Sequence, residues 1–336
     1  MMILEEDVIR VISQIDKNYF VGKRILVTGG TGLIGKTLVP TLLNLGVKVV
    51  LLVRSETKGR MMFGEKCRYY EGSVEKMPQI TEKIDCIIHM ASPTSSQFFC
   101  NNPVETISVS MEGTKALLEL ARKNNVDAFI YLSSMEVYGY PNKGHTVNEM
   151  EISGFDTRIA RNSYPISKVL CEMLCSAYYS EYGVPTKVLR LTQTFGIGVN
   201  YDDGRIFGEI MRCVIEKRNI VLHTKGDTER CYVYTADAVS AILTVLMNGQ
   251  NGEVYNVANP KTYCSIKEMA EIAAKIGHVS VEYEIDGLQR GYADTLYMNL
   301  DIGKISSIGW EPVIGLEEMF QRMINSYIEN ESSISV

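Results

Sequence analysis

The chain has 336 residues, 46% of them hydrophobic and 22% charged, and its 34 basic and 40 acidic residues give a net charge of −6. This length suits one large α/β domain, or a domain with a smaller cap, and either buries a sizeable core. The pI near 5.5 and the lack of a basic stripe argue against nucleic acid as a partner. No apolar stretch reaches the ~18 residues that span a bilayer, and the acidic amino-terminal segment is unlike a secretory signal. We therefore expect a cytoplasmic protein without a membrane partner.

Residues 1–22 are predicted as an N-terminal helical extension, because apolar residues recur at helical spacing between positions 3 and 20. Two roles are open for it: a helix packed on the domain edge, or a contact within an oligomer. The eight cysteines that follow along the chain include no Cys-x-x-Cys pair. Because no histidine lies close to Cys171 and Cys175 to complete a zinc set, we expect reduced thiols and no metal.

Strand-like and helical segments alternate from residue 23 onward. The strand-like runs are 24–29, 47–53, 85–91, 128–134 and 186–192, and the helical stretches are 33–45, 103–124 and 163–183. The strands are continuous apolar runs, which is typical of a parallel sheet covered on both faces. The pattern predicts an α/β fold with a doubly wound parallel sheet of Rossmann type.

The pattern loosens after residue 194, where a smaller, mostly C-terminal cap is expected. A short strand at 219–224, a helix at 236–247 and a strand at 253–257 are predicted, the last two returning to the sheet. The dinucleotide-binding domain is predicted at 23–195 plus about 233–258, the substrate cap at 196–232 plus 259–330, and a frayed tail at 331–336. Ligands of such sheets bind beyond the carboxyl ends of the strands, so the cleft between sheet and cap is the expected active site.

A glycine loop follows the first strand and opens a helix. In this type of loop Gly29 allows a tight turn, Gly32 lets the backbone approach a pyrophosphate, and Gly35 lets the helix pack on the strand. Leu33 and Ile34 lie at the helix N-terminus, whose free N–H groups and positive dipole end attract phosphate. We predict a bound dinucleotide, NAD(P), at this loop.

The choice between NAD and NADP depends on the end of the second strand. A carboxylate there would bind the ribose 2′-hydroxyl of NAD, but the strand ends in Arg54, which is able to pair with a 2′-phosphate. Alternatively, Arg54 stacks on adenine or faces solvent. The sequence slightly favours NADP and does not exclude NAD. Ala91 and Ser92, at the end of the third strand-like run, are predicted to line the same cofactor site.

Tyr164 and Lys168 lie four residues apart, on one face of a predicted helix. A free tyrosine, with a pKa near 10, is a poor base at neutral pH. A neighbouring ammonium and the positive charge of an oxidised nicotinamide would lower that pKa. Ser134 ends the fourth strand-like run and is placed to hold the reacting oxygen. These three residues are predicted to remove a hydroxyl proton while hydride leaves the same carbon.

With these motifs the chain resembles the extended short-chain dehydrogenase/reductases, the nucleotide-sugar epimerase, dehydratase and decarboxylase family, over about residues 23–328. Residues 84–93 and 102–103 are similar to the corresponding run of UDP-glucuronate decarboxylases. Residues 133–139 are similar to a segment shared by those decarboxylases and the sugar 4,6-dehydratases. The resemblance implies oxidation of a nucleotide-sugar at C4 and a homodimer formed through helices 103–124 and 163–183.

The resemblance also supplies candidate substrate residues. Glu136 matches the glutamate that removes a proton next to the 4-keto carbon in the dehydratases and helps to position the sugar in the decarboxylases. Arg161, Arg205 and Arg230 match arginines near the substrate, and Gln193 stands where relatives usually have an asparagine. Ser134 is also expected to contact the sugar. The alternative for Glu136 is a local cap or salt bridge.

Met135 stands where the dTDP-glucose dehydratases carry an acidic aspartate, and a thioether cannot donate a proton. The resemblance favours a decarboxylase-like or dehydratase-like course through a 4-keto sugar. The alternatives are a nucleotide-sugar 4-epimerase, a net NADPH-dependent reductase and, more remotely, a non-catalytic dinucleotide sensor.

Overall fold

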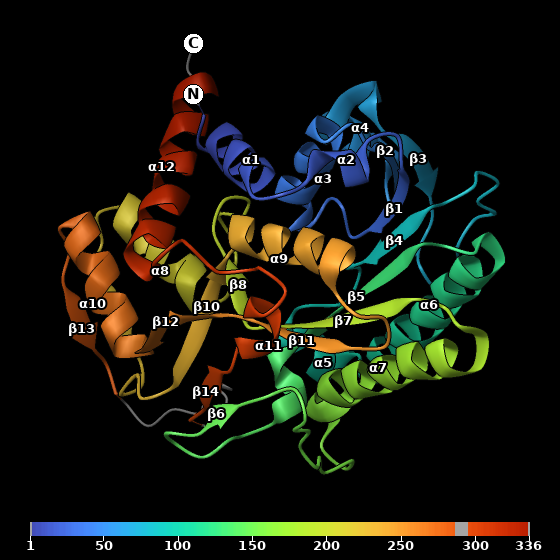
Figure 1. Cartoon of the computed structure of the whole chain (residues 1–336). Helices are drawn as coiled ribbons and strands as arrows, with labels where there is room; N and C mark the ends of the chain where they lie inside the picture. The colour runs from blue at the N-terminus through green and yellow to red at the C-terminus, as the bar shows by residue number, and fades with distance from the viewer. Residues whose placement is uncertain (1, 286–294, 335–336) are drawn as a thin grey trace.

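The computed structural model describes residues 2–285 and 295–334. Its centre is a parallel sheet with the strand order β11-β7-β5-β4-β1-β2-β3 (Figure 1). The strands are β1 (Arg24–Thr28), β2 (Lys48–Val53), β3 (Arg68–Glu71), β4 (Cys86–His89), β5 (Ala128–Ser134), β7 (Thr186–Leu191) and β11 (Val254–Val257). Every neighbouring pair is parallel, so the carboxyl ends of the strands meet at one edge of the sheet. The predicted doubly wound sheet is confirmed.

Side chains from the two faces of this sheet fill two separate cores. In β1, Ile25 and Val27 belong to one apolar cluster and Leu26 to the other, because successive side chains of a strand point to opposite faces. The first face is covered by α3 (Gly35–Asn44) and α9 (Thr235–Asn248), and the second by α6 (Pro103–Asn124) and α7 (Ser163–Tyr182) (Figure 1). Burial on both faces explains why the strands read as continuous apolar runs.

The long helices end where the sequence places their stop signals. Helix α6 has Pro103 in its first turn and is followed by Asn125 in the left-handed region, with φ 48°. Helix α7 is followed by Gly183, with φ 69°. These are common helix start and stop signals, and both helices keep their predicted ranges to within one residue.

Strand β3 is missing from the sequence-based prediction. It lies at the edge of the sheet and pairs with β2 alone. Of its four residues only Tyr69 is fully buried, so no apolar run marks it. The short helix α4 (Glu56–Phe63) connects β2 to this edge.

The expected helical and irregular cap also contains strands, and the prediction is wrong on this point. A second sheet has the order β12-β10-β14-β6, with β8 pairing to β10, and β9 pairs with β13 separately. These strands are β6 (Thr146–Val147), β8 (Gln193–Phe195), β9 (Ile220–Leu222), β10 (Glu229–Tyr234), β12 (Asn259–Ser265), β13 (Val281–Tyr283) and β14 (Tyr297–Leu300). Since β6 and β8 precede residue 196, the second sheet draws on segments from both sides of the predicted boundary, and the domain limits themselves stay a prediction.

The remaining helices surround the two sheets. They are α1 (Ile3–Ser13), α2 (Lys17–Phe20), α5 (Ser96–Asn101), α8 (Ile206–Ile215), α10 (Ile266–Gly277), α11 (Gly303–Ser306) and α12 (Leu316–Ile334). Helix α1 packs against α3, α9 and α12 (Figure 1), so the N-terminal segment is a helix at the edge of the fold. Helix α12 continues through Ile334, into the segment predicted as a frayed tail, and residues 335–336 lie outside the described residues.

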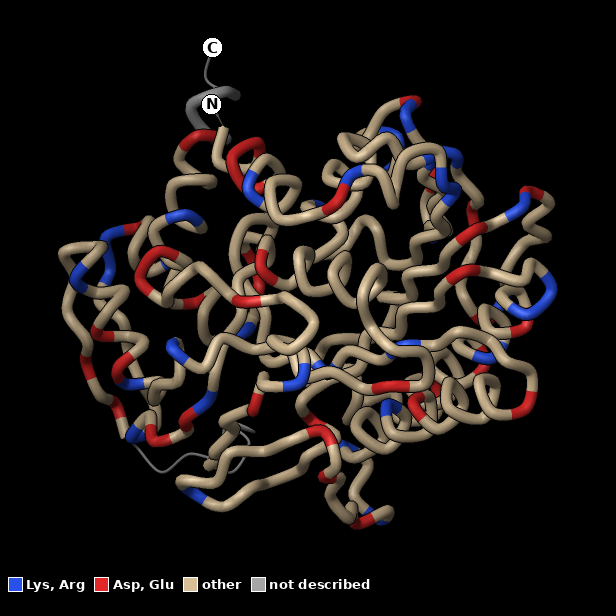
Figure 2. Tube along the Cα trace, in the orientation of Figure 1, with Lys and Arg blue, Asp and Glu red and all other residues tan. Residues whose placement is uncertain are grey.

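Charged residues of both signs are interspersed along the chain (Figure 2). Within the described residues, no helix combines the length and the apolar character that crossing a membrane requires.

Candidate active site

The glycine loop joins the end of β1 to the start of α3 at the carboxyl edge of the sheet. Gly29 has a φ of 73°, and a Cβ there would lie 2.9 Å from the backbone nitrogen of Ala91. A Cβ on Gly35 would overlap the carbonyl oxygen of Gly30. Both positions therefore require glycine, and the loop lies directly against the segment that follows β4.

The N-terminus of α3 offers free backbone donors at this loop. Gly32 is exposed, Leu33 and Ile34 are half-buried, and the N-cap residue Ile34 makes no side-chain cap. The first-turn N–H groups and the positive end of the helix dipole are thus suited to a phosphate. Ser92 Oγ is buried and has no hydrogen-bond partner among the described residues. A dinucleotide fits these features, with its pyrophosphate on the loop.

A buried histidine fixes the two halves of this cradle together. Thr28 Oγ1 accepts hydrogen bonds from the backbone nitrogens of Met90 (3.2 Å) and Ala91 (3.1 Å). Its own proton is then directed to His89 Nδ1 at 2.8 Å, which leaves Nε2–H to donate to Thr114 Oγ1 at 3.1 Å. Burial lowers the pKa of His89 to about 3, so the ring is neutral and this pattern holds at physiological pH.

The end of β2 carries an arginine, as predicted, but an acid lies beside it. Arg54 is exposed. Glu71, at the end of β3, is in register with Val53, and its carboxylate accepts a hydrogen bond from the backbone nitrogen of Glu56 at 2.7 Å. Sequence reasoning missed this acid because it missed the strand that carries it.

Ser134, Tyr164 and Lys168 come together from β5 and α7. Tyr164 and Lys168 are buried one turn apart on α7. Lys168 Nζ donates to the carbonyl oxygen of Leu132 at 2.8 Å and lies 5.7 Å from the centre of the Tyr164 ring. A hydrogen bond also links the side chains of Ser134 and Tyr164. The structure therefore assembles the three residues that sequence spacing suggested.

The expectation that Lys168 lowers the pKa of Tyr164 is not met by the groups of this chain. Burial raises the pKa of Tyr164 well above 10, and the Glu136 carboxylate adds to this effect. The hydrogen bond from Ser134 and two nearby arginines act in the opposite direction. Lys168 is itself buried, which lowers its pKa to about 8. The chain's own groups thus hold Tyr164 as a neutral phenol.

Glu136 and Arg161 form an ion pair at 2.8 Å, each with 30% of its side chain exposed. The Arg161 guanidinium lies 5.0 Å from the centre of the Phe99 ring. That ring stacks on Tyr164 with centroids 4.2 Å apart and planes 8° apart. Phe99 belongs to α5, and no sequence signal pointed to it, because its contact depends on the position of α5 beside α7.

Met135 follows Ser134 and is buried. Its thioether sulfur accepts a hydrogen bond from Thr192 Oγ1 at 3.4 Å. This position therefore holds an acceptor rather than the acid of the sugar dehydratases.

The predicted substrate residues on the cap side lie on β8, on β10 and before α8. Gln193 Oε1 and Arg230 Nε are buried without hydrogen-bond partners among the described residues. Arg205 pairs with Asp203, with contacts of 2.9 and 2.6 Å, and its charge acts on Tyr164. Arg161 and Arg205 thus belong to the tyrosine cluster, whereas no described hydrogen bond or ion pair joins Gln193 or Arg230 to it. Unpaired buried polar atoms are unusual and fit a polar ligand.

Comparison with known proteins places the chain in a family. Residues 25–258 match the sequence model of the NAD dependent epimerase/dehydratase family. The chain belongs to this family. It is therefore an enzyme of the extended short-chain dehydrogenase/reductase type, in agreement with the resemblance found in its motifs.

Two curated relatives illustrate the family's range. The chain is 30% identical over 311 residues to UDP-glucuronic acid decarboxylase 1 of Xenopus tropicalis, covering 91% of this chain and 72% of the relative. It is 26% identical over 328 residues to human dTDP-D-glucose 4,6-dehydratase, covering 92% of this chain and 91% of the relative.

Solved structures share the fold. A UDP-glucose 4-epimerase from Thermotoga maritima, with UDP-glucose, superposes with a TM-score of 0.80 at 24% identity, covering 92% of this chain and 99% of the other. A UDP-glucose 4-epimerase from Thermus thermophilus, in complex with NAD, gives a TM-score of 0.78 at 22% identity, covering 91% and 99%.

A buried ion pair lies behind the catalytic residues of this epimerase/dehydratase family member. Arg190 of β7 binds Glu172 of α7 through contacts of 2.7 to 3.2 Å, and the two side chains are 2% and 7% exposed. Ser133 donates to Glu172, and Arg190 also donates to Tyr138 Oη at 3.0 Å. The pair ties together β5, β7 and α7, which carry Ser134 and Lys168. Its members are far apart in sequence, so only the fold identifies it.

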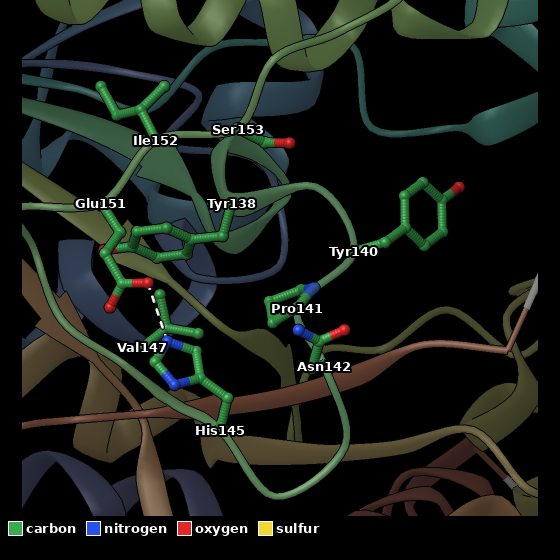
Figure 3. Close-up of a pocket in the computed structure, with 9 residues that line it drawn as sticks. All are labelled: Tyr138, Tyr140, Pro141, Asn142, His145, Val147, Glu151, Ile152 and Ser153. Carbon is green, nitrogen blue, oxygen red and sulfur yellow. Dashed lines mark hydrogen bonds and ion pairs between the residues drawn. The ribbon is translucent and has the colours of Figure 1, made fainter.

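A cavity of about 290 Å³ lies beyond this ion pair, next to Tyr138 (Figure 3). His145 Nε2 and Glu151 Oε2 lie 2.8 Å apart in its wall, and no predicted site residue lines it. Within the described residues, no group of three or more His, Cys, Asp or Glu is arranged to hold a metal ion.

Proposed function

We propose that this enzyme oxidises a nucleotide-sugar at C4 and then decarboxylates it through a 4-keto intermediate. The main observation behind the proposal is the convergence of Ser134, Tyr164 and Lys168 with the Glu136–Arg161 pair. These groups lie near the carboxyl edge of the sheet that also carries the glycine loop. Membership of the epimerase/dehydratase family and the similarity to a UDP-glucuronic acid decarboxylase support the same chemistry.

The residues of the chain divide the work between oxygen and carbon. Tyr164 takes the proton of the sugar 4-hydroxyl, and Ser134 donates a hydrogen bond to the same oxygen. A bound nicotinamide supplies hydride acceptance at C4 and later hydride return. The positive nicotinamide would also lower the tyrosine pKa that burial raises, so Tyr164 becomes a base only when oxidised cofactor is present.

The fate of the 4-keto sugar depends on what surrounds C5 and C6. In a 4-keto uronate the C5–C6 bond breaks with loss of carbon dioxide, and its electron pair moves toward the C4 carbonyl as an enolate. Ser134 and Tyr164 stabilise that oxygen, Glu136 positions the sugar, and a proton is then added at C5. Elimination of water would need an acid beside Ser134, whereas Met135 supplies only a thioether. The site therefore favours decarboxylation over dehydration.

We propose NADP as the preferred cofactor. Arg54 is exposed at the end of β2, where a 2′-phosphate would lie. The neighbouring Glu71 carboxylate is engaged by the amide of Glu56. We also propose a homodimer formed through α6 and α7, both of which expose apolar side chains.

The test is a mass-spectrometric panel with the purified chain and the variant Tyr164→Phe. UDP-glucuronate, dTDP-glucose, GDP-mannose and a CDP-sugar are each incubated with NAD⁺ or NADP⁺. We expect loss of carbon dioxide from UDP-glucuronate, faster with NADP⁺. Turnover by Tyr164→Phe should fall at least about a hundredfold, while its affinity for the cofactor stays within about twofold, because the glycine loop is untouched.

Other products identify the alternatives. Loss of water indicates a dehydratase, an unchanged mass with a new chromatographic peak indicates an epimerase, and stoichiometric consumption of NADPH indicates a reductase. Near-full activity of Tyr164→Phe would refute the mechanism. Cofactor binding with every sugar nucleotide unchanged would refute the proposed substrate class.

A further inference from the structure

Lys36 connects the glycine-loop helix to a distant segment of the chain. It follows Gly35 in the first turn of α3 and is half-buried. Its Nζ donates to the carbonyl oxygen of Gly198 at 2.8 Å and to Asn200 Oδ1 at 3.1 Å. Among the described residues no ion pair with a carboxylate is found for it, and burial together with the charge of Lys58 lowers its pKa. The Lys36 ammonium thus binds only neutral acceptors on the segment after β8.

The contact between Lys36 and this segment is close along the whole side chain. Gly198 has a φ of 93°, and a Cβ there would lie 2.8 Å from Lys36 Cδ and 3.4 Å from the carbonyl oxygen of Leu33. Position 198 therefore requires glycine for two reasons, its backbone angle and the space that the lysine stem occupies. From α12, Tyr327 donates to the carbonyl oxygen of Val199. The segment thus lies flat against the first turn of α3.

The same segment leads directly to a predicted substrate arginine. Asp203 accepts two hydrogen bonds from Arg205, and the Arg205 charge acts on Tyr164. Arg212 of α8 donates to the carbonyl oxygens of Tyr201 (2.6 Å) and Asp203 (2.9 Å). The loop 196–205 is therefore attached to α8 at its distal end and to α3 at its proximal end.

We propose that Lys36 is a positioning residue, which anchors the loop 196–205 to the glycine-loop helix and so holds Arg205 toward the nucleotide-sugar. The Arg205 part of this inference rests on the proposed function. In this arrangement the helix that binds the dinucleotide also fixes the loop that contacts the sugar, so the two ligands are aligned by one side chain. Lys36 touches neither ligand itself.

The anchor is tested by hydrogen–deuterium exchange of the full chain, without any sugar. In Lys36→Met the stem is kept and the ammonium is removed, and we expect backbone amides of 198–205 to exchange about tenfold faster than in the wild type. Peptides of the glycine loop should be unchanged. Lys58→Met is the matched control, because it removes a neighbouring exposed ammonium that anchors nothing. Equal exchange of 198–205 in Lys36→Met and the wild type would overturn the anchor.

The positioning role is tested by the dissociation constants of UDP-glucuronate and of NADP⁺. We expect Lys36→Met to weaken UDP-glucuronate about five- to tenfold and NADP⁺ less than twofold, with Lys58→Met like the wild type. Faster exchange without weaker sugar binding would show a purely structural contact and overturn the positioning role. Failure of the wild type to bind UDP-glucuronate would count against the proposed function, and the exchange experiment would still decide the anchor.

Discussion

Phe99 links two parts of the proposed mechanism through its two ring contacts. Its ring stacks on Tyr164 at 4.2 Å and lies 5.0 Å from the Arg161 guanidinium. Arg161 in turn holds Glu136. Aromatic stacking and cation–π contacts are each worth about 0.5–1.5 kcal/mol, enough to fix the orientation of the phenol relative to the carboxylate.

We therefore predict that Phe99→Leu lowers kcat about tenfold, because it removes both ring contacts while conserving most of the volume. The melting temperature should change little. Steady-state kinetics with the substrate found in the panel would measure this, with Phe98→Leu as the control on the same helix. Equal effects of the two substitutions would show that the Phe99 contacts do not matter.

At the scale of elements, helix α1 is attached to the rest of the fold by a buried acid. Asp7 accepts hydrogen bonds from Tyr234 Oη of β10 at 2.7 Å and from Arg322 of α12 at 3.0 Å. Arg10 and Arg322 lower the pKa of Asp7, and Glu6 raises it, but burial dominates and raises it to about 6. Asp237 of α9 has its pKa raised to about 6 by the same cause.

An acid whose pKa is raised by folding binds its proton more tightly in the folded state. Its contribution to stability is therefore complete below its ordinary pKa of 3.8 and is lost as the pH rises through about 6. For Asp7 the shift corresponds to about 2–3 kcal/mol. Since α1 packs on α3, the same titration acts on the helix that carries the glycine loop.

We predict that Asp7→Asn removes this pH dependence. The free energy of unfolding of the wild type, relative to the variant, should fall by about 2 kcal/mol between pH ~4.5 and ~7.5. Urea unfolding at several pH values would measure the difference, and Glu5→Gln, an exposed acid on the same helix, is the control. A constant difference between wild type and Asp7→Asn would disprove the prediction.

At the scale of the whole molecule, α6 and α7 present an apolar face. Side chains at helical spacing on both helices are exposed, namely Val104, Ile107, Met111, Leu170 and Met173. The two helices pack on one another and together cover one face of the sheet (Figure 1). An apolar face of this kind suits a twofold contact with a second copy of the chain.

We predict that Met173→Glu, which places a charge on a side chain that is 64% exposed, converts a dimer into a monomer. Size-exclusion chromatography with light scattering would show the change in mass. Met61→Glu, on α4, is the control, because its side chain is 84% exposed and lies away from α6 and α7. A wild-type monomer, or a dimer that survives Met173→Glu, would count against this face.

The sequence by itself determined the features that local chemistry controls. The glycine loop, the helix ranges and the tyrosine–lysine pair are set by φ preferences, helix stop signals and a four-residue spacing, all of which act within one segment. Burial on both faces of the sheet made the central strands readable as apolar runs. The family resemblance rested on the same local motifs.

The features that the sequence did not reveal depend on packing between distant segments. Strand β3 is an edge strand with one fully buried side chain, and the cap strands pair with partners far along the chain. The Phe99 stack and the Arg190–Glu172 pair exist only once helices and strands are assembled. The same holds for the pKa of Tyr164, because burial, which only the tertiary structure creates, outweighs its local neighbours.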